Sequence, residues 1–152
     1  MKLKLILATC VAITVPLYLA GCSPQTPVPM QPLDPTHRFV DCDTFNETEI
    51  VYEEVEISLD DTLTVTLCSN PSTGFQWLET ARISNPATII QTDHTYISPE
   101  DENPVLPGAA GVEQWTFQPV NKGMTFVYMD YGQPWEGGEQ KVWTYTVLVT
   151  VK

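Results

Sequence analysis

The chain has 152 residues, enough for one domain, and its formal charge of −12 comes from 19 acidic and 7 basic residues. Such a polyanion repels a phosphate backbone, so we expect no nucleic-acid partner. A hydrophobic fraction of 43% excludes a fully disordered chain, and only 2 histidines leave little room for a histidine-rich metal site or a Ser-His hydrolase. Aromatic residues at 10% favour strands and a contact surface over a helical bundle.

The N-terminal segment has the pattern of an export signal. Two lysines precede an apolar run over 5–19, which is shorter than the roughly 20 residues that a membrane span needs. Leu-Ala-Gly-Cys over 19–22 then resembles the bacterial lipoprotein signal, in which a peptidase cuts before a cysteine that carries diacylglycerol. We therefore expect a signal peptide over 1–21, a lipid on Cys22 and a mature charge of −14. An ordinary secretory signal with a chance cysteine is the alternative.

A lipid on Cys22 would anchor the protein to the bacterial cell envelope, since each buried CH₂ contributes about 0.8 kcal/mol. Five prolines follow within 23–35, at nearly every second or third position, which blocks a helix and favours an extended, semi-rigid spacer. We expect residues 22–37 to form the lipidated cysteine and its tether. The tether would hold a domain over 38–152 off the membrane, on its periplasmic or extracellular face.

The pattern of the domain is strand-like throughout. Apolar and polar residues alternate over 54–59, 62–67 and 143–151, which is the period of half-buried antiparallel strands, and no long run has the 3.6-residue helical period. The expected fold class is all-β: an immunoglobulin-like β-sandwich of about seven antiparallel strands, with Trp77 in its core. The expected strands cover about 49–59, 62–68, 74–83, 88–97, 112–119, 123–131 and 141–151.

The mature chain would have three cysteines, and two of them remain for a disulfide once Cys22 is set aside. Cys42 and Cys68 would meet in an oxidising compartment, where they can form a bridge. The bridge would pin the segment before the first strand to the end of the second, and on the chain-entropy estimate it stabilises the fold by about 3–4 kcal/mol. Two buried free thiols are the alternative.

Alternate loops of an antiparallel sandwich lie at the same end, so the second, fourth and sixth connections share one end. Loop 1, Asn70 to Gly74, is expected to be stiff, because Pro71 fixes φ, Gly74 permits a positive φ and the Asn70 side chain can close an Asx turn. Ser72 and Thr73 place small hydroxyls at its tip. A well-formed turn without a binding role is the alternative.

Loop 2 covers 104–111 and is apolar, small and bracketed by glycine. Its residues Gly108, Ala109, Ala110 and Gly111 would let the backbone approach another surface closely and would expose amides and carbonyls to it. A flexible linker that happens to be apolar is the alternative.

Loop 3 covers 132–139 and carries a tryptophan outside any strand pattern. Gln133 and Pro134 precede this Trp135, and a Gly-Gly pair follows shortly after it. An exposed Trp is costly unless it binds something, and Trp leads the residue types of interface hot spots, so Trp135 is a candidate contact residue. The alternative is that the indole folds back over the end of the sandwich.

Together the three loops resemble those of the chagasin-type inhibitors of papain-like cysteine proteases. That family carries Asn-Pro-Thr-Thr-Gly, Gly-x-Gly-Gly and Arg-Pro-Trp loops in this order. Here they read Asn-Pro-Ser-Thr-Gly over 70–74, Gly-Ala-Ala-Gly over 108–111 and Gln-Pro-Trp over 133–135. The resemblance spans residues 48–152, nearly the whole domain.

Three residues depart from the family pattern. Ser72 keeps the hydroxyl of the commoner Thr, and Ala110 narrows the backbone angles open to loop 2. Gln133 is the larger change, because it lacks the charge and the fork geometry of the family's Arg. We expect this change to affect potency or the preferred protease and to leave the binding mode intact.

The resemblance implies a reversible, competitive inhibitor that acts as a three-loop wedge. Loop 1 would enter the catalytic cleft of a papain-like cysteine protease, with Thr73 closest to the Cys-His pair of the enzyme. Loop 2 would pair its backbone with one side of the cleft, and Trp135 of loop 3 would pack on the other side. No cofactor is implied, and we expect a monomer.

Three other functions fit the sequence less well. Catalysis is not supported, because the sequence contains no Gly-x-Ser-x-Gly motif. Asp93 and His94 do not form a ready catalytic pair either, because neighbouring residues of a strand point to opposite faces. The acidic run from Asp41 looks like a calcium loop but lacks the glycine at its sixth position, so we expect no metal site. A non-inhibitory adhesion module could use the same loops, because a fold does not fix a partner.

Overall fold

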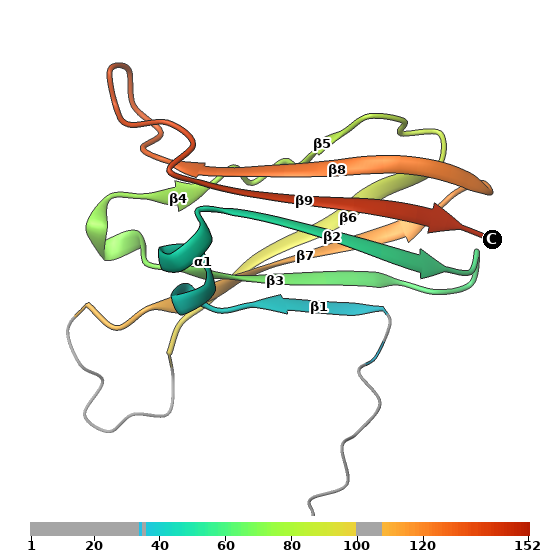
Figure 1. Ribbon diagram of the computed structural model, residues 1–152, viewed down its shortest axis with the longest axis horizontal. Helices are drawn as coiled ribbons and strands as arrows, with labels where there is room; N and C mark the ends of the chain where they lie inside the picture. Colours follow the sequence, from blue (N-terminus) through green and yellow to red (C-terminus); the bar gives the residue numbers. More distant parts are fainter. Residues whose placement is uncertain (1–33, 35, 100–107) are drawn as a thin grey trace, which may run out of the picture. The chain divides into compact units, whose positions relative to one another are not determined.

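The computed structural model describes residues 34, 36–99 and 108–152, which form two packed β-sheets and one short helix (Figure 1). The expected signal peptide, the lipidation site Cys22, most of the tether and residues 104–107 of loop 2 lie outside the described residues. Within the described ranges, no helix has the length and apolar character needed to cross a membrane.

The first sheet has four strands in the order β1-β3-β7-β6. Antiparallel pairing joins β3 to β7 and β7 to β6, while β1 runs parallel to β3. The strand bounds are β1 His37–Val40, β3 Leu63–Ser69, β6 Ile89–Ile97 and β7 Gly111–Pro119.

The second sheet has the order β2-β9-β8-β4, and the short strand β5 also pairs with β8. β8 pairs antiparallel with β9, β4 and β5, while β2 runs parallel to β9. The strand bounds are β2 Ile50–Ile57, β4 Gln76–Trp77, β5 Arg82–Ile83, β8 Gly123–Gly132 and β9 Trp143–Val151.

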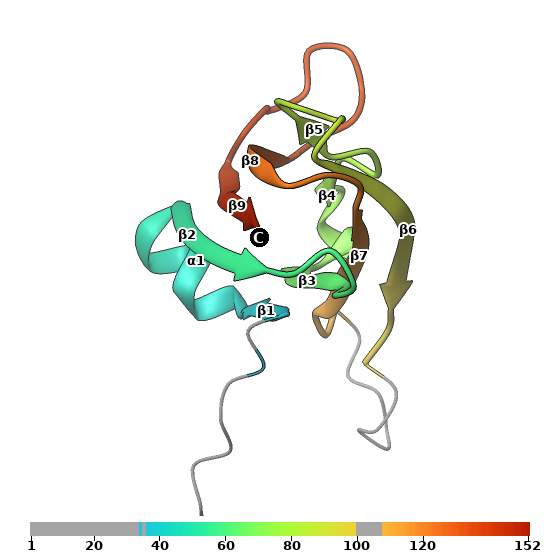
Figure 2. The same cartoon turned by 90° about the vertical axis from the view of Figure 1, so that its right-hand side faces the viewer.

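The core lies between the two sheets, which Figure 2 shows end on. Alternating residues of the paired strands turn inward, as the period-2 pattern predicts, and Trp77 is 1% exposed at the centre. The predicted all-β, immunoglobulin-like sandwich is confirmed. The largest buried side chains include Trp77, Trp115, Tyr145, Phe45, Phe117, Leu63 and Leu67.

The prediction of one continuous strand over 74–83 is wrong, because the structure has two short strands there, β4 and β5. The backbone between them bends so that the Glu79 carbonyl accepts hydrogen bonds from Trp115 Nε1 at 3.1 Å and from Gln91 Nε2 at 2.8 Å. A buried indole N–H needs a partner, and this break in the strand supplies it.

Two pairings are parallel where only antiparallel strands were expected. Strand β1 begins at His37, the last residue assigned to the tether, and its ring Nε2 lies 3.0 Å from Thr66 Oγ1. The chain then crosses from the first sheet to the second through helix α1, Cys42–Thr48, before β2 starts. This crossing puts β1 and β2 on the edges of different sheets, each parallel to its neighbour.

Helix α1 was not predicted, since its seven residues are too few to show a helical period. Asp41 caps its start by accepting the Thr44 N–H at 2.8 Å, and Phe45 is fully buried beneath it. The predicted Cys42–Cys68 disulfide is confirmed, and it ties the first residue of α1 to the end of β3. The helix is therefore fixed beside the segment where loop 1 begins.

Candidate functional site

The three loops lie at one end of the sandwich, as the alternation of strand directions predicts. Strand β3 ends at Ser69, opposite the first residue of β7, so loop 1 leaves where loop 2 returns. Gln76 pairs with Gly132, which places the far side of loop 1 beside the start of loop 3. Helix α1 lies at the same end (Figure 1), and the ring of its Phe45 lies 5.2 Å from that of Trp77 on β4.

Loop 1 folds as a single 3₁₀ turn over Pro71–Thr73. The Asn70 carbonyl accepts both the N–H and the hydroxyl of Thr73, at 3.1 and 2.6 Å. Gly74 closes the turn with φ 82°, in the left-handed region that favours glycine, and its N–H donates to the Pro71 carbonyl at 3.0 Å. The tip is thus stiff, with Ser72 and Thr73 exposed upon it.

Asn70 connects loop 1 to its surroundings, but not through the Asx turn that the sequence suggested. Its side-chain oxygen accepts the Ser72 hydroxyl at 2.6 Å, not a backbone N–H. Its amide nitrogen is used further away, donating to the Gly108 carbonyl of loop 2 at 2.9 Å. Its backbone N–H donates to the Tyr131 hydroxyl at 3.0 Å. One residue therefore joins two loops and strand β8.

The described part of loop 2 separates into exposed and buried residues. Gly108, with φ 86°, and Ala110 are exposed, and Ala109 is half-buried. Gly111 is buried at the start of β7, and a β-carbon there would lie 2.7 Å from the Tyr96 hydroxyl. Three of the four predicted residues can therefore reach a partner, while Gly111 serves the packing of β6 against β7.

Loop 3 is a hairpin closed at its base by Gln133. The Gln133 N–H donates to the Glu139 carbonyl at 2.7 Å, and the Gln133 side-chain oxygen accepts the Glu139 N–H at 2.9 Å. A tight turn at the tip joins the Gly138 N–H to the Trp135 carbonyl at 3.1 Å, with Gly137 at φ 79°. The glutamine that replaces the family's arginine thus holds its own loop together.

Trp135 stands on loop 3 with 50% of its surface exposed, and its indole rests against loop 1. A β-carbon added to Gly74 would lie only 2.9 Å from Trp135 Cη2. The absence of a side chain at Gly74 is what lets the ring approach this closely. The indole is thus both exposed and packed, which combines the two alternatives that the sequence left open.

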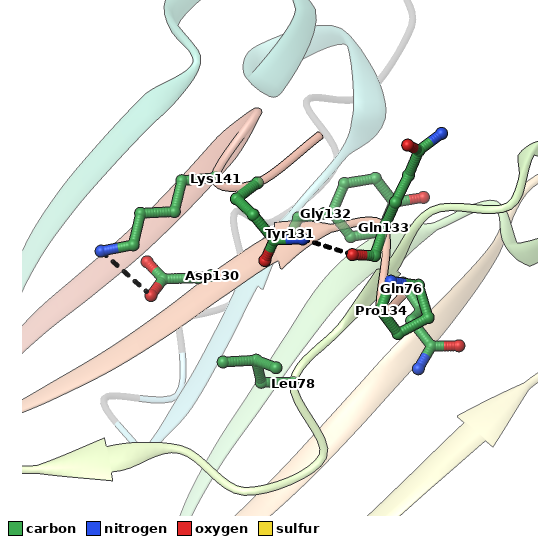
Figure 3. A pocket seen from close by; sticks show the side chains of 9 residues that line it. Gln76, Leu78, Asp130, Tyr131, Gly132, Gln133, Pro134 and Lys141 are labelled. Atoms are coloured by element: carbon green, nitrogen blue, oxygen red, sulfur yellow. Dashed lines mark hydrogen bonds and ion pairs between the residues drawn. The ribbon is translucent and has the colours of Figure 1, made fainter. Parts of the chain in front are cut away.

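A small hollow of about 130 Å³ lies at the base of loop 3, beside β4 (Figure 3). Pro134 and Gln76 line it, and Lys141 points to the Asp130 carboxylate, with Nζ 3.6 Å from Oδ2. Arg82 approaches the same carboxylate oxygen at 3.3 Å. Asp130 of β8 thereby links the chain that returns from loop 3, through Lys141, to β5, through Arg82.

An aromatic platform supports the loops from beneath. Tyr131 and Trp143 stack at 4.6 Å between ring centroids, Trp143 stacks on Phe45 at 5.2 Å, and Trp77 lies 5.1 Å from Tyr131. Phe75, which follows loop 1, stacks on Tyr131 at 6.0 Å. The sequence analysis missed this set, although the aromatic residues directly beside loops 1 and 3, Phe75 and Tyr131, were a signal for it. The platform consists of Phe45, Phe75, Trp77, Tyr131 and Trp143.

A buried carboxylate lies next to loop 1 and was also missed. Glu113 is 4% exposed and accepts the Ser69 hydroxyl at 2.6 Å, while His94 Nε2 lies 2.8 Å from its other oxygen. His94, on β6, thus pairs with a residue of the neighbouring strand β7 and not with Asp93. Because the serine bonds to the carboxylate and not to the imidazole, this group is no nucleophile–base pair. It fixes the end of β3, where loop 1 starts.

Comparisons with known proteins agree with this arrangement. The chagasin family peptidase inhibitor I42 profile matches residues 56–149. Amoebiasin-2 of Entamoeba histolytica is 26% identical over 98 residues, which are 64% of this chain and 76% of that protein.

Solved structures show the same fold. The cysteine protease inhibitor EhICP2 from Entamoeba histolytica superposes with a TM-score of 0.60 at 20% identity, covering 76% of this chain and 96% of that one. PbICP-C, solved in complex with falcipain-2, gives a TM-score of 0.52 at 17% identity, covering 76% and 99%. Since the family profile matches more than half of the sequence, the chain belongs to the chagasin family of peptidase inhibitors.

Proposed function

We propose that the chain is a reversible, competitive inhibitor of papain-like cysteine proteases and that loops 1, 2 and 3 form the wedge that fills the active-site cleft. The observation that carries this proposal is the joining of the three motifs into one surface. Asn70 bonds to Gly108, and Trp135 packs on Gly74, so each loop is fixed to loop 1. A pre-ordered surface loses little entropy on binding.

The shape of loop 1 explains how it would occupy a protease cleft without being cut. Its tip is a 3₁₀ turn whose bonds run back to Asn70 and Pro71. A thiolate attacks a peptide bond only when the carbonyl is presented in near-attack geometry, and a closed turn does not present it so. The tip therefore blocks the cleft near Thr73 while its own peptide bonds stay intact.

The composition of the three motifs suits a desolvated cleft. None of the residues over 70–74, 108–111 and 133–135 carries a charge, although the whole chain is strongly acidic. Burying a charge without a partner costs far more than burying a small neutral group. The neutral wedge thus avoids this cost, and its exposed indole supplies the apolar contact.

Two relatives support the choice of target class. EhICP2 is named as a cysteine protease inhibitor, and PbICP-C was solved in complex with falcipain-2. The test is a titration of the purified full-length protein against papain with a fluorogenic substrate. We expect KM to rise with inhibitor while kcat stays constant, and activity to return on dilution. Full papain activity at micromolar protein would favour a non-inhibitory adhesion module.

We also propose that the protein is exported and lipid-anchored through Cys22 to the bacterial cell envelope. The support is the sequence alone: a positively charged start, a short apolar run and Leu-Ala-Gly-Cys over 19–22. Metabolic labelling with a fatty acid checks it, since the wild type should carry the label and Cys22→Ala should not. An unlabelled wild type in the soluble fraction would contradict the anchor.

A further inference from the structure

A groove runs between α1 and the chain that returns from loop 3 into β9. It consists of two adjoining hollows, one of about 400 Å³ and one of about 410 Å³. Both hollows are lined by Asn46 of α1 and by Val142 and Trp143, so they adjoin at these three residues.

The first hollow is largely apolar and opens at the tip of the proposed wedge. Its walls include Phe75 and Tyr131 of the aromatic platform, together with Thr73 of loop 1 and Ala110 of loop 2. Because Thr73 belongs both to this wall and to the tip, anything that surrounds the tip comes next to the hollow.

The second hollow is acidic. Glu49, at the end of α1, and Glu139, on loop 3, both line it. Neither carboxylate has a hydrogen-bond or ion-pair partner among the residues that the structure describes. Lys141 also lines this hollow, but its ammonium faces the Asp130 carboxylate at 3.6 Å. The groove therefore offers two free negative charges.

The backbone is strained at this hollow. Glu49 and Lys141 have φ values of 57° and 56°, and among the described residues they are the non-glycine residues with positive φ. The Glu49 carbonyl accepts the Thr144 N–H at 2.9 Å, which holds the strained residue against β9. Strained backbone of this kind clusters at active sites, ligand clamps and switch regions.

Helix α1, which forms one wall of the groove, lies before the range that the family profile covers. The disulfide to Cys68 and the stacking of Phe45 on Trp143 fix it in place. The wall that α1 supplies therefore lies outside the three family motifs, whereas Thr73 and Ala110 on the facing wall belong to them.

We infer that the groove is a fourth contact surface for the inhibited protease and that it takes a segment of the enzyme carrying an apolar side chain next to a lysine or arginine. The inference rests on the proposed function, because Thr73 brings the enzyme to the groove. The apolar hollow beside Thr73 matches the apolar side chain, and the unpaired Glu49 and Glu139 match the cation. A second copy of this acidic chain would meet like charges there.

The first arm of the test fills the groove. Asn46→Trp adds bulk to the shared wall, while Glu47→Trp adds the same bulk on the same helix at a residue that lines neither hollow. We expect Asn46→Trp to raise the inhibition constant for papain about tenfold or more, and Glu47→Trp to change it by less than about twofold. Thermal unfolding of both variants checks that α1 stays folded.

The second arm removes the charge without adding bulk. Glu49→Gln with Glu139→Gln is compared with Asp60→Asn combined with Asp93→Asn, which removes the same charge from exposed residues outside the groove. At low salt we expect the first pair to weaken inhibition more than the second by about threefold to tenfold. The difference should shrink at high ionic strength.

The outcomes are separable. If the wild type does not inhibit papain, the proposed function itself fails. If the wild type inhibits but either groove variant behaves like its control, the inference is overturned and the function stands. The molecular mass of the inhibitor alone would rise with concentration if the protein formed a dimer. If Asn46→Trp prevented that rise, the groove would bind a second copy, and the inference would also be overturned.

Discussion

Gly74 meets two separate demands at a single position. Its φ of 82° closes loop 1, and its bare α-carbon faces the Trp135 ring. A side chain there would be strained by the backbone angle and would collide with the indole, whose Cη2 lies 2.9 Å from the position of a β-carbon. Loops 1 and 3 therefore keep their relative position only with glycine at this residue.

Gly74→Ala should accordingly weaken inhibition more than it weakens the fold. We expect the unfolding free energy to fall by about 1 kcal/mol or more, the cost of a non-glycine residue in a left-handed conformation. Displacement of the indole should in addition raise the inhibition constant and change the fluorescence of Trp135. An inhibition constant equal to that of the wild type would show that the contact of loop 3 with loop 1 is not needed.

Trp135→Ala tests the indole directly. The ring is half exposed, so its removal should cost little stability, but truncation of an interface hot spot weakens binding by about 2 kcal/mol or more. Inhibition kinetics with papain, beside thermal unfolding of the same variant, measure both effects. An unchanged inhibition constant would remove Trp135 from the site.

At the scale of elements, α1 depends on two restraints, the disulfide and the Asp41 cap. The bridge joins residues 26 apart in the sequence, for which the chain-entropy model gives about 3–4 kcal/mol. Replacing both Cys42 and Cys68 by serine should lower the unfolding free energy in urea by this amount. A thiol reductant should destabilise the wild type similarly and leave the double variant unaffected. If the reductant destabilises both proteins equally, loss of the Cys42–Cys68 bridge is not what destabilises the wild type.

Asp41 should make the stability of α1 depend on pH. The Thr44 N–H bonded to its carboxylate holds the pKa of Asp41 below its ordinary value. A carboxyl whose pKa is lower in the folded state stabilises that state above its unfolded pKa of about 3.9, and the contribution is lost as pH falls through the folded pKa. The Thr44 amide resonance should follow this titration. Asp41→Asn caps the helix without titrating, so it should abolish the pH-dependent change of the Thr44 amide resonance. If that change persisted in the variant, Asp41 would not be its cause.

These elements also show what could be predicted from the sequence. The long strands and the three loops were predictable, because alternation and the Asn, Pro and Gly residues of a turn act locally. Strand β1 and helix α1 were not, because four and seven residues carry no readable period and are held by contacts with distant residues. The bond from Asn70 to Gly108 spans 38 residues, and no local rule predicts it.

At the scale of the whole molecule, the charge is distributed unevenly with respect to the site. The chain carries −12, yet the motifs of the three loops are neutral. Long-range attraction should therefore speed the encounter with a basic protease, while the final contact depends little on charge. The proposed charged groove adds a smaller, short-range contribution.

For a basic papain-like protease, the association rate should fall as salt rises, because the Debye length shrinks from about 10 Å at 0.1 M to about 3 Å at 1 M. The dissociation rate should change much less, since the wedge carries no charge. Stopped-flow and dilution measurements give the two rates separately. An association rate independent of salt would contradict the proposed steering.

The direction of β1 determines how an anchored molecule would face. β1 runs parallel to β3, and β3 ends at loop 1, so the domain begins at His37 on the pole opposite the wedge. A lipid at Cys22 would pull on that opposite pole. The inhibitory tip lies at the far pole from that attachment point, where the anchored domain would leave it free to meet a protease.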